Sequence, residues 1–508
     1  MKYDYSKLQN GSDIRGIAMD NIPGETINLT EEAVERLAKG FLYLLTLKTG
    51  KAPSELSVAV GRDSRLSGPA LEQAFANALS GYGCKILVCG LASTPAMFMA
   101  TVFPEFKCDG SVMITASHLP MNRNGMKFFD ANGGLDKADI ADIINFAESN
   151  SILGRLMPAH AEDNVTEVDL MSVYCKHLRS LITENVGDGD KPLKGLSITV
   201  DAGNGAGGFY ASHVLEPLGA DVSSSQFLEP DGSFPNHAPN PENKEAIASI
   251  CAKVSEAKTN LGLIFDTDVD RASAVDEHGN EINRDAIVAL AAALIADKFP
   301  GTTVVTDSIT GKPLTAFLEQ ELGLKHLRFK RGYKNVINKA NELCEQGTDS
   351  QLAIETSGHA AYKENYFLDD GAYLATKIVI KTALLHKEGR GISTLISGLA
   401  KPAESREVRF PILAEDFGAL GDRIISELTD AVKAGEISFA SLEEPNYEGV
   451  RINFDSPDTD GWLLLRKSLH DPIMPLNIES SVEGGCRQIA DIVRPFIAKY
   501  EELDISAL

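Results

Sequence analysis

One local pattern recurs along most of this 508-residue sequence: a short apolar segment, a polar loop rich in Gly, Ser and Asp, and then a stretch with helical periodicity. The apolar segments are residues 56–60, 86–88, 112–114, 198–200, 261–265, 304–306 and 352–354. Strands that alternate with helices of about 10 to 15 residues are typical of α/β units with largely parallel sheets. Ligands of such sheets bind at the carboxyl ends of the strands, so we expect the functional residues in these polar loops.

The pattern also indicates how the chain is divided. The phrases VAVGRD, ITVDAGNG and VVTDSITG each pair a strand with a loop, and they start at residues 58, 198 and 304. This recurrence predicts three related mixed α/β domains, over residues 1–162, 163–284 and 285–402. The segment 403–508 combines strand-like pieces at 406–410, 450–454 and 462–466 with a final helix near 484–500, and it predicts a smaller α+β domain. We therefore expect an α/β fold of four domains around a central cleft.

Charge and composition exclude several classes of protein. Lys and Arg total 48 while Asp and Glu total 72, and the resulting net charge of −24 argues against nucleic acid or an anionic membrane as a partner. The longest apolar run, residues 287–296, fits a core helix but not a membrane span of about 20 residues. The N-terminus lacks the apolar segment of a secretion signal, and the seven cysteines contain no C-x-x-C pair. These features favour a cytoplasmic protein.

The strongest chemical signal is LGLIFDTDVDR, in which Asp266, Asp268 and Asp270 alternate directly after an apolar strand. Alternation along an extended segment places the three carboxylates on one side of it. Two carboxylates about 4 Å apart repel by about 4 kcal/mol at an effective dielectric constant of about 20, so three together require a cation. Oxygen ligands without His or Cys favour Mg²⁺.

Other interpretations of the same segment stay open. An EF-hand loop has Gly where Arg271 stands and a helix before the loop. A haloacid-dehalogenase-type phosphotransferase would use Asp266 as its nucleophile, but its motif has Thr or Val in place of Asp270. The segment can also be an acidic surface turn that binds nothing.

Two further loops carry reactive side chains after predicted strands. In GSVMITASHLPMNRNGMK, Ser117 lies in a tight polar loop, but serine is a poor nucleophile without a base, a lowered pKa or a metal. Its neighbour His118 is expected to face away from it, so a Ser–His hydrolase triad is not indicated, and Ser117 taken alone is better explained as a turn residue. In ETSGH, alternating Glu355, Ser357 and His359 suit hydroxyl recognition and proton transfer, although a loop histidine is usually just solvated.

Two basic segments stand out in this acidic chain. Residues 322–341 contain no Asp or Glu but include Lys325, Arg328, Lys330, Arg331, Lys334 and Lys339. The turn after the predicted strand 462–466 gathers Arg466, Lys467, Ser468 and His470. Arginine and hydroxyl donors in a turn can bind a phosphate group. The run 322–341 is equally well explained as a solvated basic face.

Taken in order, these loops resemble those of the α-D-phosphohexomutase family, in particular its phosphomannomutase/phosphoglucomutase members, and the likeness covers nearly the whole chain. TASHLP followed by NGMK is similar to the family's phosphoserine loop, DTDVDR to its metal loop and ETSGH to its sugar-recognition loop. SDIRG, GRDSRLSG and FKRGYK resemble three more family elements, which contain Arg15, the pair Arg62 and Arg65, and Lys330.

The resemblance implies an Mg²⁺-dependent isomerase that interconverts the 1-phosphate and the 6-phosphate of a hexose, mannose and/or glucose, through a phosphoserine enzyme and a bound 1,6-bisphosphate. It implies one Mg²⁺ per chain, held by Asp266, Asp268, Asp270 and the phosphorylated Ser117. The implied catalytic residues are Ser117, Arg15, Lys127, Arg271 and His359, and the implied substrate contacts are Glu355, Ser357, His359, Lys330, Arg466, Ser468 and His470. Glucose or mannose 1,6-bisphosphate is the implied activator, and the implied assembly is a monomer or a homodimer.

Two parts of the chain depart from the family pattern. Leu119 replaces the Asn that usually follows the histidine of the serine loop. Residues 466–472 read RKSLHDP where the family has R-P-S-G/N-T-E-P, so a flexible Gly or Asn and a Thr hydroxyl are missing. A non-catalytic sugar-phosphate-binding homologue therefore stays as an alternative. A metal-dependent sugar-phosphate phosphatase with Asp266 as its nucleophile is a second one, and phosphoglucosamine mutase is a third, because the sequence does not fix the sugar.

Overall fold

The computed structural model of the chain describes residues 4–159, 164–468 and 471–508. It divides into two compact units, one made of Met1–Asn283 with Ser357–Thr394 and the other of Arg284–Thr356 with Leu395–Leu508. The predicted boundary between residues 162 and 163 falls outside the described residues, and the three boundaries between the four domains stay a prediction. Each of the seven apolar segments singled out in the sequence overlaps a strand.

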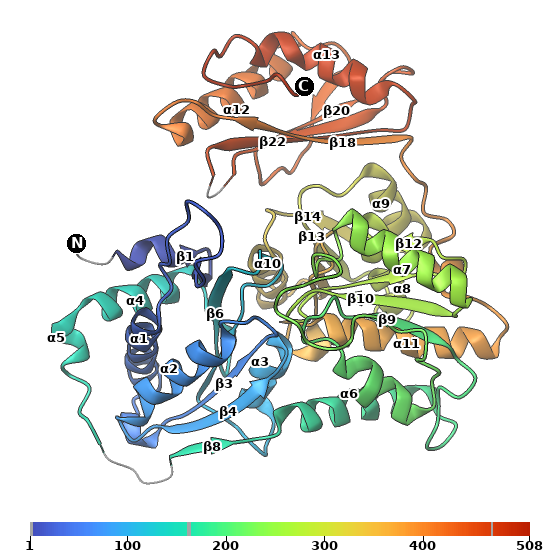
Figure 1. The fold of residues 1–508 in the computed structure, drawn as a ribbon. Coiled ribbons are helices and arrows are strands. Elements are labelled where there is room, and N and C mark those ends of the chain that lie inside the picture. Colours follow the sequence, from blue (N-terminus) through green and yellow to red (C-terminus); the bar gives the residue numbers. More distant parts are fainter. Residues whose placement is uncertain (1–3, 160–163, 469–470) are drawn as a thin grey trace. The chain divides into compact units, whose positions relative to one another are not determined.

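The first unit begins with an eight-stranded mixed sheet (Figure 1). Its strands are β1 (Gln9–Asn10), β2 (Asp13–Ile17), β3 (Ser57–Arg62), β4 (Lys85–Leu91), β5 (Gly110–Ile114), β6 (Arg123–Asp130), β7 (Gly133–Gly134) and β8 (Val165–Glu167). Their order is β1-β2-β6-β5-β3-β4-β8, with β7 beside β6. The run β5-β3-β4-β8 is parallel, whereas β1, β2 and β6 pair in the antiparallel sense. The loop that contains Ser117 directly follows the carboxyl end of β5.

The helices of this part are α1 (Glu31–Thr49), α2 (Gly68–Ser80), α3 (Thr94–Val102), α4 (Lys137–Glu148) and α5 (Asn150–Leu153). Thr30 caps the N-terminus of helix α1, because its Oγ1 accepts a hydrogen bond from the Ala33 amide (3.1 Å). Phe41 of α1 packs against Phe75 of α2 and Phe128 of β6, with ring centroids 6.5 and 4.9 Å apart. Full burial of one such side chain contributes roughly 1.5–3 kcal/mol, so these rings fix the helices on the sheet.

A second sheet of the same unit has the order β12-β11-β10-β9. Its strands are β9 (Ile198–Asp201), β10 (Leu261–Phe265), β11 (Ala272–Val275) and β12 (Glu281–Ile282), and only β9 and β10 are parallel. Helix α7 (Lys244–Ala257) packs on β10, while α6 (Leu170–Val186) packs against α11 (Gly371–Lys387). The buried Tyr174 hydroxyl of α6 donates to both carboxylate oxygens of Asp370 (2.7 and 2.8 Å), at the start of α11. The antiparallel strands β16 (Ala360–Tyr362) and β17 (Leu368–Asp369) lie just before that helix.

The second unit contains the parallel strands β14 (Lys325–Arg328), β13 (Thr303–Thr306) and β15 (Ser350–Ile354), in that order. Its helices in this region are α8 (Asp285–Ala296), α9 (Lys312–Ala316) and α10 (Tyr333–Glu345). The apolar run 287–296 forms most of α8 and is largely buried, which confirms the prediction of a core helix.

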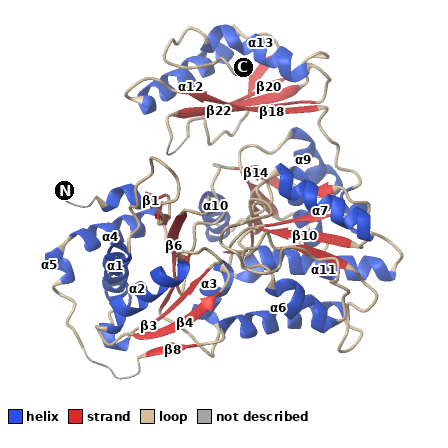
Figure 2. Cartoon of the chain, in the orientation of Figure 1, coloured by secondary structure: helices blue, strands red, loops and turns tan. Residues whose placement is uncertain are grey.

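The C-terminal part of the second unit is an antiparallel sheet with two helices on one face (Figure 2). The strands are β18 (Glu404–Pro411), β19 (Ala440–Leu442), β20 (Val450–Phe454), β21 (Gly461–Leu465) and β22 (Ile473–Ser480), in the order β18-β22-β21-β20-β19. The helices α12 (Phe417–Lys433) and α13 (Gly485–Ile497) cover a core that includes Phe410, Ile424, Phe454 and Ile489. The predicted α/β class, with a smaller C-terminal α+β part, is confirmed.

Candidate active site

Ser117 lies in the loop after β5 in a backbone conformation that is unusual for a serine. Its φ is +50°, in the left-handed region, which costs roughly 1–3 kcal/mol for a residue with a side chain. Its amide donates to Thr115 Oγ1 (2.9 Å). Its buried Oγ lies 3.0 Å from Asp266 Oδ2 and 3.0 Å from Arg271 Nη2. The conformation thus presents the hydroxyl to a carboxylate and a guanidinium.

The three predicted metal-binding aspartates converge, but not along an extended segment as the sequence suggested. After β10 the chain turns, and Val269 has a left-handed φ of +66°. This turn, which lies between β10 and β11, brings oxygen atoms of Asp266, Asp268 and Asp270 within 4.8 Å of one another. All three side chains are buried. The prediction of an extended segment is wrong, because left-handed backbone at one residue breaks the alternation.

The donor set of this cluster fits Mg²⁺. All three ligand candidates are carboxylate oxygens, which is the chemistry that Mg²⁺ and Ca²⁺ prefer. The buried Oδ1 atoms of Asp268 and Asp270 have no hydrogen-bond partner within the described part of the chain. A buried carboxylate oxygen without a partner is costly, so a cation beside these two atoms would remove that cost.

Two cationic side chains already face the cluster. Lys127 of β6 donates to Asp268 Oδ2 (3.0 Å) and to Asp270 Oδ2. The Nε of Arg271 lies 3.3 Å from Asp266 Oδ2. Lys127 and Arg271 are both buried, and each is surrounded by acidic side chains.

The pKa values in the cluster reflect this competition between burial and pairing. Burial raises the pKa of Asp266 well above its ordinary value, and the neighbouring Asp270 and Asp268 raise it further. Burial also opposes the charge of Asp270, but Lys127, His359 and Arg271 outweigh it, so the pKa of Asp270 is lowered. Burial disfavours the charge of Lys127 too, yet Asp268 and Asp270 hold the pKa of its ammonium well above the usual value. The negative charges of the aspartates in this cluster are therefore partly balanced by Lys127 and Arg271.

Strand register places Arg15 beside the serine loop. Arg15 of β2 pairs with Gly125 of β6, and Lys127, which is also on β6, pairs with Met113 of β5. The guanidinium of Arg15 donates to the Thr115 carbonyl (3.1 Å) and to Asp13 (2.8 Å). Three neighbouring strands thus bring Arg15, Lys127 and Ser117 to one region of the unit.

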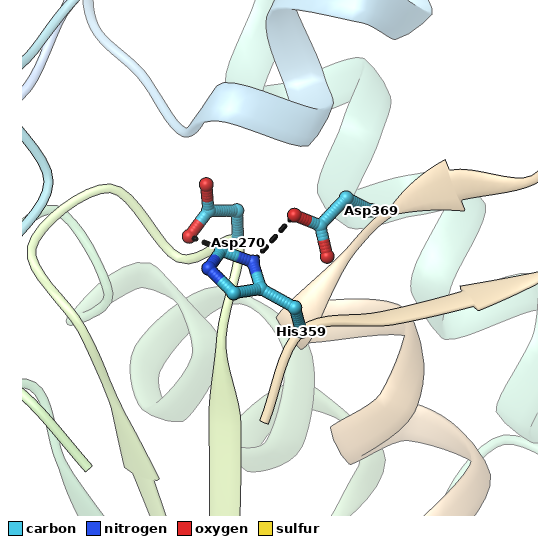
Figure 3. Close-up of side chains that lie close together, drawn as sticks. All are labelled: Asp270, His359 and Asp369. Carbon is cyan, nitrogen blue, oxygen red and sulfur yellow. Dashed lines mark hydrogen bonds and ion pairs between the residues drawn. The ribbon is translucent and has the colours of Figure 1, made fainter. Parts of the chain in front are cut away.

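His359 reaches the same cluster from a later part of the chain (Figure 3). It forms an isolated antiparallel bridge with Arg271, and Gly358 has a φ of +91° where a side chain would run into the Ala272 backbone. The Nδ1 of His359 lies 2.5 Å from Asp369 Oδ2 and 3.7 Å from Asp270 Oδ1. Burial lowers the pKa of His359, but Asp369 and Asp270 outweigh it and raise that pKa to about 9.

His118 and Thr94 also contact the cluster, and the sequence argument missed both. The expectation that His118 faces away from Ser117 is wrong, because the left-handed Ser117 backbone brings Oγ to 3.3 Å from His118 Nδ1. The Arg271 guanidinium contacts the same nitrogen and lowers the pKa of His118 to about 2, so this imidazole is a poor general base. Thr94, at the start of α3, donates to Asp268 Oδ2 (2.5 Å), and its amide donates to the Asp268 carbonyl (2.8 Å). The tripeptide S-T-P at residues 93–95 is typical of a helix start, and this signal could have drawn attention to Thr94.

The predicted sugar-recognition residues are divided between the two units. Glu355 belongs to the second unit, where its carboxylate accepts a hydrogen bond from the Gly332 amide (2.6 Å). Ser357 and His359 belong to the first unit, and the buried Ser357 Oγ has no hydrogen-bond partner among the described residues. Lys330, in the second unit, is exposed in the loop between β14 and α10.

The last predicted loop is only partly described. Arg466 follows β21, its side chain is 13% exposed, and its Nη1 lies 4.0 Å from Glu448 Oε1. Ser468 Oγ accepts a hydrogen bond from the Asp471 amide (3.2 Å), while Lys467 pairs with Asp422 of α12 (2.6 Å). The predicted contact His470 lies outside the described residues.

Comparison with known proteins supplies independent information. The chain matches, in succession, three family models described as phosphoglucomutase/phosphomannomutase alpha/beta/alpha domains I, II and III, over residues 6–151, 172–279 and 283–402. Phosphomannomutase/phosphoglucomutase of Pseudomonas putida is 30% identical over 96% of this chain and 95% of that protein. A probable phosphoglucosamine mutase of Methanosphaera stadtmanae is 27% identical over 97% and 98%. The crystal structure of a phosphoglucomutase/phosphomannomutase family protein from Burkholderia thailandensis has a TM-score of 0.76, with 25% identity over 96% of each chain.

The fold and the relatives define a class of enzyme, an isomerase that works by phosphoryl transfer. Within that class, the chain belongs to the phosphoglucomutase/phosphomannomutase family, that is, to the α-D-phosphohexomutases. The family and the enzyme class expected from the sequence are confirmed. None of the helices in the described parts of the chain is long and apolar enough to cross a membrane.

Proposed function

We propose that this phosphohexomutase interconverts the 1-phosphate and the 6-phosphate of a hexose, mannose and/or glucose, with Ser117 as the carrier of the phosphoryl group. One observation carries the proposal: the Ser117 hydroxyl lies 3.0 Å from both Asp266 and Arg271, inside a cluster that also contains Lys127 and the other two aspartates. A phosphoryl group on Ser117 would sit among the cations that phosphoryl transfer requires.

In the first half-reaction, the phosphoryl group would leave Ser117 Oγ for a free hydroxyl of the bound hexose monophosphate, which gives a 1,6-bisphosphate. In the second, the other phosphoryl group of that bisphosphate would move to Ser117 Oγ, which regenerates the phosphoserine and releases the isomeric monophosphate. The intermediate must turn around between the two steps, since one serine serves both ends of the sugar. Added glucose or mannose 1,6-bisphosphate would therefore phosphorylate Ser117 and activate the enzyme.

The residues of the cluster would divide the work. Arg271 already contacts Ser117 Oγ and would neutralise the charge on the moving phosphoryl group. Lys127, Arg15 and His359 are the candidates for handling the hydroxyl proton or for adding positive charge. Asp266, Asp268 and Asp270, with the phosphoserine, would hold Mg²⁺, which when bound supplies a divalent positive charge next to that group.

Seven residues are proposed to contact the substrate. Glu355, Ser357 and His359 are proposed to bind sugar hydroxyls, because they follow β15 in the order of the family's sugar loop. Lys330, Arg466, Ser468 and His470 are proposed to hold the phosphate that is not reacting. The partly buried Arg466 supports this role, since its Nε has no hydrogen-bond partner within the described residues.

The test is a direct assay on three substrates. The purified protein, with Mg²⁺ and a trace of hexose 1,6-bisphosphate, is given mannose, glucose or glucosamine 1-phosphate, and products are resolved by ³¹P NMR. We expect mannose or glucose 6-phosphate to form. Turnover of glucosamine 1-phosphate alone would assign the chain to phosphoglucosamine mutase. Release of inorganic phosphate would identify a phosphatase, and binding without turnover a non-catalytic homologue.

A further inference from the structure

The side chain of Arg65 is enclosed by the loop that carries Ser117, although Arg65 and Ser117 are 52 positions apart in the sequence. Its side chain is 0% exposed. The guanidinium donates to four main-chain carbonyl oxygens of that loop: Ser117, Leu119 (2.7 Å), Pro120 (2.8 Å) and Arg123 (3.0 Å). The planar fork of one arginine therefore binds carbonyl groups along the whole turn.

Asp63 connects this arginine to the other side of Ser117. The Asp63 carboxylate is fully buried and accepts from Arg65 Nε (3.2 Å) and from the Thr115 hydroxyl (2.7 Å). Thr115 Oγ1 in turn accepts from the Ser117 amide (2.9 Å). The amide of Ser117 is thus anchored through Thr115, and its carbonyl through Arg65, by one connected network.

Packing alone does not explain a charged residue at this position. A buried Arg–Asp pair loses much hydration, and apolar side chains of similar volume often replace such pairs without loss of stability. What apolar side chains cannot reproduce is a set of donors aimed at four carbonyl groups. The Phe234 ring lies over the guanidinium, 5.4 Å from its carbon, and helps to keep water from competing for those carbonyls.

We propose that Arg65 is a positioning residue for phosphoryl transfer. By binding the carbonyl of Ser117 and those of the following turn, Arg65 holds Ser117 in its left-handed conformation and so directs Oγ toward Asp266 and Arg271. The inference rests on the proposed function of Ser117 as phosphate carrier and names a residue on which that function depends.

Arg65→Lys tests the inference, because an ammonium group cannot reach four carbonyl oxygens in the plane of a guanidinium. Dephosphorylated protein is mixed with hexose 1,6-bisphosphate, and the rate of Ser117 phosphorylation is followed by quenched-flow mass spectrometry. We expect this rate and kcat to fall about 100-fold, the size of effect that a displacement of about 1 Å produces, while KM changes little. Arg36→Lys is the matched control, since Arg36 also donates to a main-chain carbonyl, that of Ala147 (2.8 Å), at a different place in the unit.

Two further measurements separate positioning from general stability. Urea unfolding of both variants gives the folded fraction, and the phosphorylation rate is expressed per folded molecule. Thr115→Val removes the other anchor and keeps Arg65, so it should slow the same step even if Arg65→Lys folds poorly. A wild-type phosphorylation rate in folded Arg65→Lys, or in Thr115→Val, would overturn the inference. A wild-type protein that takes no phosphate on Ser117 would instead overturn the proposed function.

Discussion

The hydroxyl oxygen of Ser117 lies 3.0 Å from Oδ2 of Asp266, although the two residues are 149 positions apart in the chain. Ser117 follows β5 of the first sheet and Asp266 follows β10 of the second, so the contact joins two sheets of one unit. The Asp266 carboxylate, whose pKa is raised, accepts from the hydroxyl, and Arg271 Nη2 lies 3.0 Å from the same Ser117 oxygen. The candidate phosphate carrier and the candidate metal ligands therefore form one site.

Asp268→Asn should weaken metal binding and activity together. The change preserves shape but removes one negative charge from the set that Lys127 and Thr94 contact. We expect a fall in activity of about 100-fold or more and a clear loss of Mg²⁺ affinity in isothermal titration calorimetry. Asp297→Asn, an exposed acidic position at the end of α8, is the control. Unchanged Mg²⁺ affinity in Asp268→Asn would refute its role as a ligand.

Arg466→Ala should raise KM for the hexose phosphate far more than it lowers kcat. A hydrogen bond to a charged group contributes about 1.5–3 kcal/mol, which corresponds to roughly 10- to 100-fold in KM. Steady-state kinetics with the preferred 1-phosphate measures the effect. Arg409→Ala serves as the control, because the Arg409 side chain on β18 is 68% exposed. An unchanged KM in Arg466→Ala would show that the altered loop 466–472 does not bind the phosphate.

Glu479→Gln should stabilise the second unit at alkaline pH. Burial, followed by the nearby Asp285, raises the pKa of Glu479 from 4.5 to about 7. Between pH 4.5 and about pH 7, the folded state keeps a proton on Glu479 that the unfolded state has lost. The stability that Glu479 contributes is therefore lost as pH rises through about 7. Glutamine keeps an oxygen for the Trp462 Nε1 donor, 3.1 Å away in the native protein, and carries no charge.

Urea or thermal unfolding at pH 5.5 and pH 8 measures this effect. We expect Glu479→Gln to exceed the wild-type free energy of unfolding by roughly 1–3 kcal/mol at pH 8, and by a smaller amount at pH 5.5, which lies between the pKa values of the unfolded and folded states. The exposed Glu436→Gln should show no such difference. A Glu479→Gln protein whose stability follows the wild-type pH profile would show that Glu479 is ionised in the fold throughout this range.

The strands and the chemical identity of the loops could be predicted from local sequence. The apolar segment 261–265 coincides with β10, because a strand buried on both faces imposes a continuous apolar run. The alternating segment 450–454 coincides with β20, whose Val450, Ile452 and Phe454 lie in the core. The DTDVDR loop was predicted for the same reason, since it comes directly after such a run. Local pattern was insufficient for the backbone of that loop, where the left-handed Val269 produces a turn instead of an extended segment.

Contacts made across the fold could not be predicted from the sequence. The basic run 322–341 was interpreted as a phosphate site or a solvated face, yet Arg328 pairs with Glu443, 115 residues away (2.6 Å). Lys467 was expected to be a donor for phosphate, but it pairs with Asp422. Thr94 and Arg65 gain their significance only when separate strands bring them to Asp268 and to the serine loop.

The central claim is that Ser117 carries the phosphoryl group, and tandem mass spectrometry of the intact protein and its peptides tests it. After incubation with hexose 1,6-bisphosphate, we expect one phosphoryl group per wild-type chain, located on Ser117, and none on Ser117→Ala, which should also lose nearly all turnover. Ser111→Ala, in the strand β5 that leads to the same loop, should still be phosphorylated on Ser117. An acid-stable phosphoryl group retained by Ser117→Ala, or an alkali-labile one found on Asp266 of the wild type, would contradict the claim.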